Sequence, residues 1–148
     1  MKKILVLLFM CFSSLFANDD FIYEKSKYNF NEFNELIKRV EQELKDRNLT
    51  IFAKFNHYQN ALDVNLTLKS NTVIVFGNPI VGTYLMQENP MIGIELPLKI
   101  LIWQDQNNET FIGYVSLKSK IQKYHIKNTV LVDKIDSLMK DIINISKK

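Results

Sequence analysis

A short apolar run in the middle of the chain restricts the possible folds more than any other feature. Four β-branched residues and a phenylalanine fill Thr72 to Phe76, and Gly77, Asn78 and Pro79 follow at once. Such a run suits a central strand, because β-branched side chains pack well on a pleated surface. Pro79 can open a helix, since its missing N–H would be unpaired there, and Asn78 can cap it. The chain is therefore expected to contain a sheet whose central strand leads into a helical segment.

Two amphipathic helices are predicted at opposite ends of this region. The first follows Asn29 and Glu32, which resemble a capping box, and Asn48 suits the left-handed residue that ends it. Its apolar face consists of Phe33, Leu36, Ile37, Val40 and Leu44. The second helix is predicted from Leu131, Ile135, Leu138, Ile142 and Ile145, which recur at three- and four-residue steps. Such a stripe usually covers its own sheet, and it could also dock on a second subunit if the sheet has two apolar faces.

Alternating residues predict the remaining strands. They cover residues 21–28, 49–55, 98–103 and 110–115, and the turn residues 105–108 join the last two as a hairpin. Residues 64–68 also alternate but suit a solvated loop equally well, and residues 117–125 resemble a short helix. The order strand, helix, strands, short helix, hairpin, helix predicts a single α+β domain. We expect a compact antiparallel sheet with helices packed on one face.

The N-terminus has the layout of a bacterial signal peptide. Two lysines precede the apolar run from Ile4 to Phe12, and the small residue Ala17 stands before a polar stretch. We therefore expect residues 1–17 to be removed near Ala17 and the domain of residues 18–148 to be periplasmic or secreted. The apolar run is short of the roughly 20 residues of a membrane span, so no stable span is expected after processing. The alternatives are an uncleaved anchor and lipid attachment at Cys11, which the bulky Met10 disfavours.

Cleavage would also change the charge and the chemistry of the chain. The full sequence has 19 basic and 16 acidic residues, and loss of Lys2 and Lys3 would lower the net charge from +3 to +1. A nearly neutral surface without a block of lysine or arginine gives no reason to expect nucleic-acid binding. The single cysteine would be lost as well, which excludes disulfides, thiolate catalysis and cysteine-bound metals from residues 18–148.

The central block resembles a known family. The residues concerned are Thr72 to Pro79, Val81-Gly82-Thr83, Leu85-Met86-Gln87, Pro90, Leu96-Pro97-Leu98-Lys99 and Trp103. Together they closely resemble the core of the DUF302 family. Phe55-Asn56-His57 with Ala61 is similar to that family's strand-end Asp-His and following alanine, with Asn56 where aspartate is common, and Tyr114 and His125 fall in two further family segments. The resemblance implies a compact α+β domain that self-associates, and it implies no activity and no catalytic residues.

The segment from Gly77 to Pro97 is the candidate ligand site. Backbone donors near the Asn78 cap, the Thr83 hydroxyl and the Gln87 amide could surround an apolar floor that includes Gly82 and Met86. The same residue types also suit a difficult chain reversal after a buried strand, and turn chemistry alone accounts for most of them.

Two other kinds of chemistry have weaker sequence signals. His57 and His125, with Met86 and Met91, could form a copper-like metal site, but the histidines lack the spacing of a ligand pair and also suit a strand end and a helix cap. Three acidic residues near the candidate site, Glu88, Glu95 and Asp105, could serve acid–base catalysis, yet none has a histidine at readable spacing and no nucleophile elbow is present. No cofactor is expected.

Two segments match the extended bacterial N-glycosylation sequon, in which an acid stands two residues before the asparagine. They are Asp46 to Thr50, around Asn48, and Asp63 to Thr67, around Asn65.

The leading functional hypothesis is a non-catalytic periplasmic module, a homodimer that binds a small ligand or a periplasmic protein. The alternatives are periplasmic handling of a copper-like metal through His and Met, and an uncharacterised enzyme.

Overall fold

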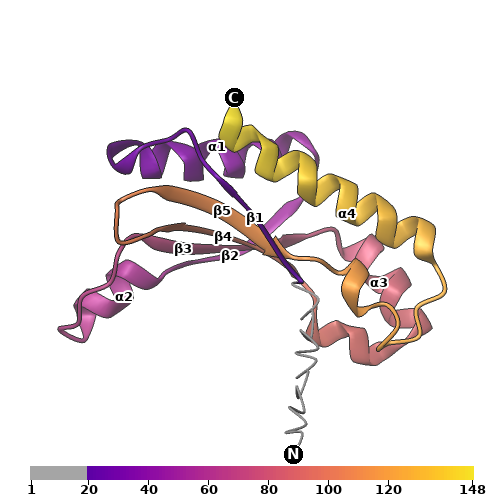
Figure 1. The fold of residues 1–148 in the computed structure, drawn as a ribbon. Helices are drawn as coiled ribbons and strands as arrows, with labels where there is room; N and C mark the ends of the chain where they lie inside the picture. The colour runs from indigo at the N-terminus through magenta and orange to yellow at the C-terminus, as the bar shows by residue number, and fades with distance from the viewer. Residues whose placement is uncertain (1–19) are drawn as a thin grey trace, which may run out of the picture.

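A computed structural model describes residues 20–148, so the expected signal peptide, its cleavage at Ala17 and the lipid attachment at Cys11 lie outside the described residues. The helices and strands are β1 (Phe21–Lys25), α1 (Phe33–Asp46), β2 (Thr50–Asn56), α2 (His57–Asp63), β3 (Asn71–Gly77), α3 (Pro79–Glu88), β4 (Leu98–Gln104), β5 (Thr110–Val115) and α4 (Thr129–Asn144). All strands join one antiparallel sheet in the order β1-β5-β4-β3-β2. The expected α+β fold is confirmed, with a single sheet in a single domain (Figure 1).

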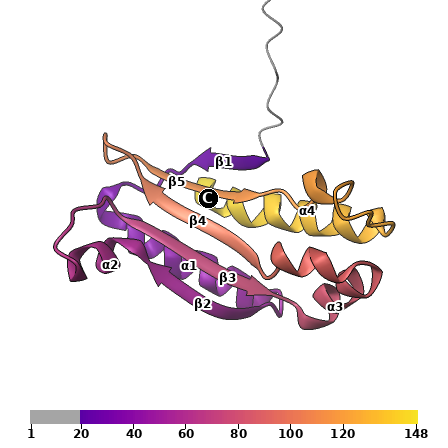
Figure 2. The ribbon, with the colours of Figure 1, turned by 90° about the horizontal axis from the view of Figure 1, so that it is seen from below.

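Two helices cover one face of the sheet and leave the other without a helix across it. Helices α1 and α4 lie side by side above the strands, whereas α2 and α3 lie at opposite ends of the sheet (Figure 1). Seen from below, the strands face the viewer directly (Figure 2). The layers are therefore helix pair, sheet and an uncovered sheet face, which we call the open face.

Strand alternation explains which side chains form the core. Thr72, Ile74 and Phe76 of β3 are at most 2% exposed, while their neighbours Val73 and Val75 are only half-buried. The same alternation places Ile100, Ile102, Ile112 and Tyr114 on the covered side. They meet the buried stripes of the helices, which are Phe33, Leu36, Ile37, Val40 and Leu44 of α1 and Val132, Ile135, Met139, Ile142 and Ile143 of α4.

The predicted helix ends are confirmed. The Asn29 backbone N–H donates to Glu32 Oε2 at 3.0 Å and the Asn29 side chain accepts from the Asn31 N–H, which makes the capping box of a 3₁₀ turn that leads into α1. Asn48 has a φ of 56° after α1, as the sequence predicts. Asn78 caps α3 and Pro79 is its first residue.

Three local predictions were wrong. β1 ends at Lys25 and not near Tyr28, because Lys27 N–H donates to the Ser146 carbonyl and draws the chain toward the C-terminus. His57 does not end a strand but begins α2, which Asn56 caps by accepting from the Gln59 N–H. Residues 117–125 contain only one 3₁₀ turn, Lys118–Lys120. Residues 64–68 form a loop, one of the two forms that their alternation allowed.

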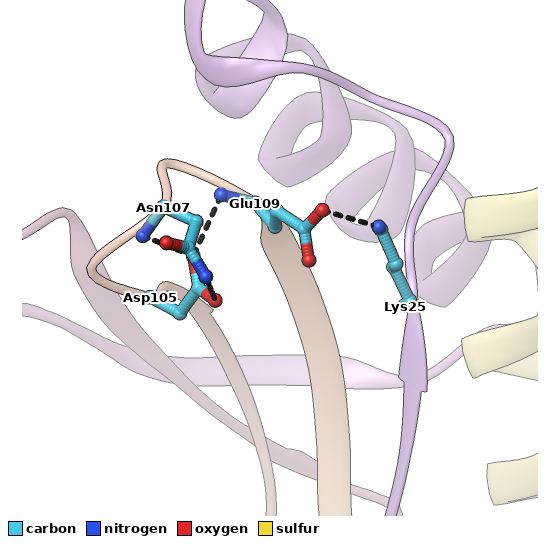
Figure 3. Close-up of polar contacts among 4 residues, drawn as sticks. All are labelled: Lys25, Asp105, Asn107 and Glu109. Carbon is cyan, nitrogen blue, oxygen red and sulfur yellow. Dashed lines mark hydrogen bonds and ion pairs between the residues drawn. The ribbon is translucent and has the colours of Figure 1, made fainter.

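The β4–β5 hairpin turn is held by the residues that the sequence assigned to it. Asp105 Oδ1 accepts from the N–H groups of Asn107 and Glu109 at 2.9 and 2.8 Å (Figure 3). Glu109 also pairs with Lys25 of β1, with 2.5 Å between Oε1 and Nζ (Figure 3). The turn is thus tied both to itself and to the neighbouring edge strand.

Both edges of the sheet are irregular. β1 is only five residues long, and the register between β2 and β3 shifts between Ile51 and Ala53, which marks a β-bulge at Phe52. The bulge leaves the Phe52 side chain 49% exposed, beside Gly77 at the end of β3.

Gly113 of β5 is required by a close approach. A Cβ at this position would lie 2.7 Å from Tyr23 Cβ and 2.8 Å from the Ile22 carbonyl oxygen. We expect Gly113→Ala to lower the free energy of unfolding by about 1–3 kcal/mol, because the β1–β5 pairing must shift to admit the methyl group. Gly77→Ala is the matched control, since its Cβ would have ordinary contacts of 3.5 Å or more. Chemical denaturation measures both, and equal stabilities of the two variants would contradict this account.

Candidate functional site

A cavity of about 330 Å³ lies where β3 leads into α3. We call it the α3 cavity. Its walls come from β2, the end of β3, the start of β4, helices α3 and α4, and the segment that follows α3. The wall residues are Phe52, Gly77, Asn78, Pro79, Val81, Gly82, Leu85, Met86, Gly93, Leu96, Pro97, Leu98 and Ile135. Asn78 supplies the one polar side chain among these residues, so the cavity is almost wholly apolar.

The β3–α3 corner is shaped by Asn78. Its Oδ1 accepts from the N–H groups of Ile80 and Val81 at 2.9 and 3.3 Å, and its carbonyl accepts from the Gly82 N–H at 3.0 Å. Pro79 needs no partner for a backbone N–H. The helix start is therefore satisfied from within the chain, which leaves few free donors at the cavity mouth.

The segment after α3 is held by the loop that precedes α4. Asn89 caps a 3₁₀ turn, Pro90–Ile94, by accepting from the Met91 N–H, and its amide donates to the Tyr124 carbonyl at 2.9 Å. The Tyr124 hydroxyl donates to Glu95 Oε1 at 2.6 Å. These bonds fix the wall of the α3 cavity that carries Gly93 and Leu96.

The structure brings together only part of the predicted ligand site. Gly82 and Met86 line the α3 cavity, and Asn78 lines it with a side chain already used as a cap. The Thr83 hydroxyl donates to the Pro79 carbonyl at 2.7 Å, and both Thr83 and Gln87 are exposed outside the cavity. The apolar half of the predicted set thus shares one cavity, whereas its polar half does not face that space.

Several wall residues had no functional signal in the sequence. Phe52 reaches the cavity because the β-bulge interrupts the alternation of β2, and a bulge cannot be read from residue types alone. Leu85 and Ile135 resemble ordinary core residues on helical stripes. Leu96 precedes Pro97 in a segment without periodicity, and only the fold shows that its side chain approaches Gly82.

The two histidines lie at opposite ends of the sheet. His57 follows β2, whose last residue pairs with Thr72, while His125 lies beside Tyr124 near the end of α3. His125 has a φ of 51° and does not cap a helix, because Asn128 caps α4. Within residues 20–148, no group of three His, Cys, Asp or Glu side chains is placed to hold a metal ion. The described geometry therefore does not bring the histidines of the metal hypothesis together.

The acidic residues near the candidate site have structural partners. Glu88 Oε2 accepts from the Lys127 and Asn128 N–H groups at 2.6 and 3.3 Å, just before α4. Glu95 accepts from Tyr124 and Asp105 closes the hairpin turn. A carboxylate held in this way is poorly placed to exchange a proton with a substrate.

The most buried carboxylate belongs to Asp136 of α4. Its Oδ1 accepts from the Ser116 hydroxyl at 2.9 Å and its Oδ2 pairs with Lys140 at 2.8 Å. Burial alone would raise the pKa of Asp136, but the bonds from Lys140 and Ser116 and the charges of Lys140 and Lys118 leave this pKa below its usual 3.8. Burial and, secondarily, the Asp136 charge raise the pKa of the nearby Tyr114 hydroxyl well above its ordinary value. Asp136, Ser116 and Lys140 do not line the α3 cavity, and the Ser116 bond ties the residue after β5 to α4.

The Asp136 bonds predict an acid-dependent part of the stability. We expect Asp136→Asn to lower the free energy of unfolding at pH 7 by about 1–3 kcal/mol, because the ion pair and part of the hydrogen bonding are lost. Since the pKa of Asp136 is depressed in the folded state, its contribution is present above pH 3.8 and disappears as the pH falls through the folded value. Urea unfolding at a series of pH values should show the two proteins converging below that point.

A control on the same helix separates this effect from general surface charge. Asp133 pairs with Lys118 at 2.7 Å, but both side chains are more than half exposed. Asp133→Asn should therefore change the free energy of unfolding by no more than about 0.5 kcal/mol. A gap between wild type and Asp136→Asn that stays constant down to pH 2 would contradict the assignment.

Comparison with known proteins gives a family and a fold. The model of a family described as "Domain of unknown function DUF302" matches residues 24–145. The crystal structure of an uncharacterized conserved protein DUF302 from Bacillus stearothermophilus superposes with a TM-score of 0.75, covering 86% of this chain and 98% of that one. Its sequence identity of 18% supports the shared fold alone.

Curated relatives match part of the chain. The fluoride-specific ion channel FluC 1 of Brucella suis is 35% identical over 78 residues, which is 53% of this chain and 31% of that protein. FluC 2 of Brucella melitensis has the same identity over 78 residues and is covered to 29%. The chain thus spans about a third of the length of these relatives. Among residues 20–148, no helix has the length and apolar character that crossing a membrane requires.

Proposed function

The chain belongs to the DUF302 family, and we propose that it is an exported, non-catalytic module that binds a small apolar molecule in the α3 cavity. The observation that carries this proposal is the cavity itself, with about 330 Å³ of space and a single polar wall residue. This volume lies at the lower end of the range of about 300–1,000 Å³ for ligand pockets.

The state of the surrounding polar groups favours an apolar ligand. Asn78 is engaged with Ile80 and Val81, and Thr83 with Pro79. A ligand hydroxyl or amide in the cavity would therefore lose its water without finding a partner, at a cost of about 1–3 kcal/mol. An apolar ligand has no such cost and gains roughly 25 cal/mol for each Å² of apolar surface removed from water.

The same bonds argue against a catalytic role. Glu88 and Glu95 near the cavity are held by backbone N–H groups and by Tyr124, and Asp136 by Ser116 and Lys140. General acid–base catalysis needs a group that is free to reach its substrate. The fluoride channels match this chain only in part, and the proposal takes no transport activity from them.

Filling the cavity tests the proposal. A Cβ added at Gly82 would lie 3.7 Å from Leu96 Cδ1 and 4.0 Å from Met86 Cε, so a leucine there would occupy the cavity. We expect saturable binding of the neutral fluorescent probe N-phenyl-1-naphthylamine to wild-type protein. The variant Gly82→Leu should bind it at least about tenfold more weakly, a loss of roughly 1.4 kcal/mol.

The matched control lies on the same helix outside the cavity. Tyr84 is 57% exposed and does not line the walls, so Tyr84→Leu should leave the probe affinity within about twofold of wild type. Thermal unfolding of each variant shows that it is folded. Equal probe binding by wild type and Gly82→Leu would refute a ligand site in the α3 cavity.

Export, homodimer formation and glycosylation complete the proposal. The two sequon asparagines are exposed and share one geometry, with φ of 56° at Asn48 and 59° at Asn65, each just past a helix end. In the proposed modification the side-chain amide nitrogen displaces the diphosphate of a lipid-linked oligosaccharide and loses a proton. Asn65 begins the irregular segment of residues 65–70, whereas Asn48 lies between α1 and β2, so Asn65 is the more accessible acceptor.

Intact-mass analysis of protein from the periplasm of its own host tests export and modification together. We expect a chain that begins at Asn18 and carries a glycan on Asn65 more often than on Asn48, because Asn48 is held between two elements. Asp63→Ala removes the acid of the second sequon and should abolish the modification of Asn65. Bare asparagines at both positions would end the glycosylation proposal, and an intact leader would end the export proposal.

A further inference from the structure

The open face of the sheet is apolar across its whole width. The apolar side chains that point to it are Phe21 and Tyr23 of β1, Phe111 and Val115 of β5, Leu101 and Trp103 of β4, Val73 and Val75 of β3, and Ala53 and Phe55 of β2. Tyr23, Val115 and Phe55 are about half exposed, at 53%, 51% and 49%. Since Tyr23 and Phe55 stand on the two edge strands, the patch extends from one edge of the sheet to the other.

The side chains of the open face form one connected surface. The strand register aligns Tyr23, Gly113, Leu101, Val73 and Phe55 in a continuous row across all five strands. The rings beside this row pack together, with centroids 5.3 Å apart for Trp103 and Phe111 and 5.8 Å apart for Tyr23 and Trp103. A contiguous apolar patch that spans a sheet is larger than isolated monomers usually expose, which indicates an interaction surface.

The charges at the open face favour a partner with the same surface. Lys25 and Lys99 are the charged residues that the described strands point to this side. Lys25 pairs with Glu109 at the hairpin end (Figure 3), and Lys99 Nζ donates to the Pro97 carbonyl at 3.0 Å. Leu101, Trp103 and Val73 carry no charge themselves, and the hollow beside Val73 and Leu101 has charges of both signs, Glu95 with Lys99 and Lys120. A mainly apolar patch without an excess of one charge at its centre can be complementary to itself, as a twofold contact requires.

The size of the face also fits a dimer. Five strands about 4.8 Å apart, each about 20 Å long, cover close to 500 Å² in projection. The solvent-accessible area of the face is larger than this projected area, because it follows every protruding side chain. It therefore approaches the ~800 Å² that each partner buries in a stable interface.

Resting on the homodimer formation included in the proposed function, we propose that the open face docks on the open face of a second copy of this chain, with the twofold axis close to Leu101 on the central strand β4. The two sheets then pack about 10 Å apart with aligned strands, and α1 and α4 of each copy form the outer layers. The assembly is independent of ligand binding, since Leu101 and Trp103 do not line the α3 cavity.

A charge at Leu101 tests the assembly. In the mature protein, analytical ultracentrifugation should show twice the mass of one chain. Leu101→Glu and Leu101→Lys should each raise the dimer dissociation constant by at least about 100-fold, because two like charges then oppose each other across the axis. Each variant should remain folded by circular dichroism, because residue 101 is on the uncovered side of the sheet.

Mixing the Leu101→Glu and Leu101→Lys variants gives the decisive test of the twofold contact. An equal mixture should form a heterodimer, since glutamate and lysine then face each other, and a misfolded variant could not do so. Val130→Glu is the matched control, because Val130 is 64% exposed on α4, away from the open face, and this variant should dimerise like wild type. A monomeric wild type at about 100 μM, a dimer that survives both Leu101 variants, or a mixture that stays monomeric would each overturn the proposal.

Discussion

The fold depends on one apolar contact, that of two helical stripes against a single face of the sheet. The β3 residue Ile74, the β4 residue Ile102 and the β5 residue Ile112 are fully buried against Leu36 and Val40 of α1 and the stripe of α4. Each such side chain contributes about 1.5–3 kcal/mol on burial. Because α1 follows the first strand of the described chain and α4 follows the last, this contact joins the two ends of the domain on one face of the sheet. No covalent link takes part in it within residues 20–148.

The sequence predicts this core well because periodic burial repeats over many residues. The α1 stripe, the alternation of β3 and the caps at Asn29, Asn48 and Asn78 all recur in the structure. Short or irregular segments were harder to predict from the sequence. Helix α2 depends on a single cap at Asn56, and no residue type marks the β-bulge at Phe52. The candidate site divides in the same way. Gly82 and Met86 were found through turn and family patterns, whereas Phe52 and Leu96 approach them only in the folded chain.

Hydrogen bonding within the chain engages most polar side chains around the α3 cavity. Asn78, Thr83, Glu88 and Glu95 have the residue types of a polar site, but each is used to hold α3 and the loop before α4 in place. Their combined effect is a rigid corner of the sheet that encloses apolar space. The two apolar surfaces described here differ in make-up, since the α3 cavity is lined mainly by aliphatic side chains and the open face carries a cluster of packed rings.

The irregular edges of the sheet bear on the proposed assembly. A regular outer strand offers a row of free backbone groups to which further strands can add without limit. Here β1 is short and turns away after Lys25, and the extra residue at Phe52 breaks the regular ladder of β2. Lateral strand addition is therefore disfavoured on both sides, and the proposed face-to-face pair leaves no further copy of the open face exposed. The kink at Phe52 thus favours a closed complex over an open-ended fibre.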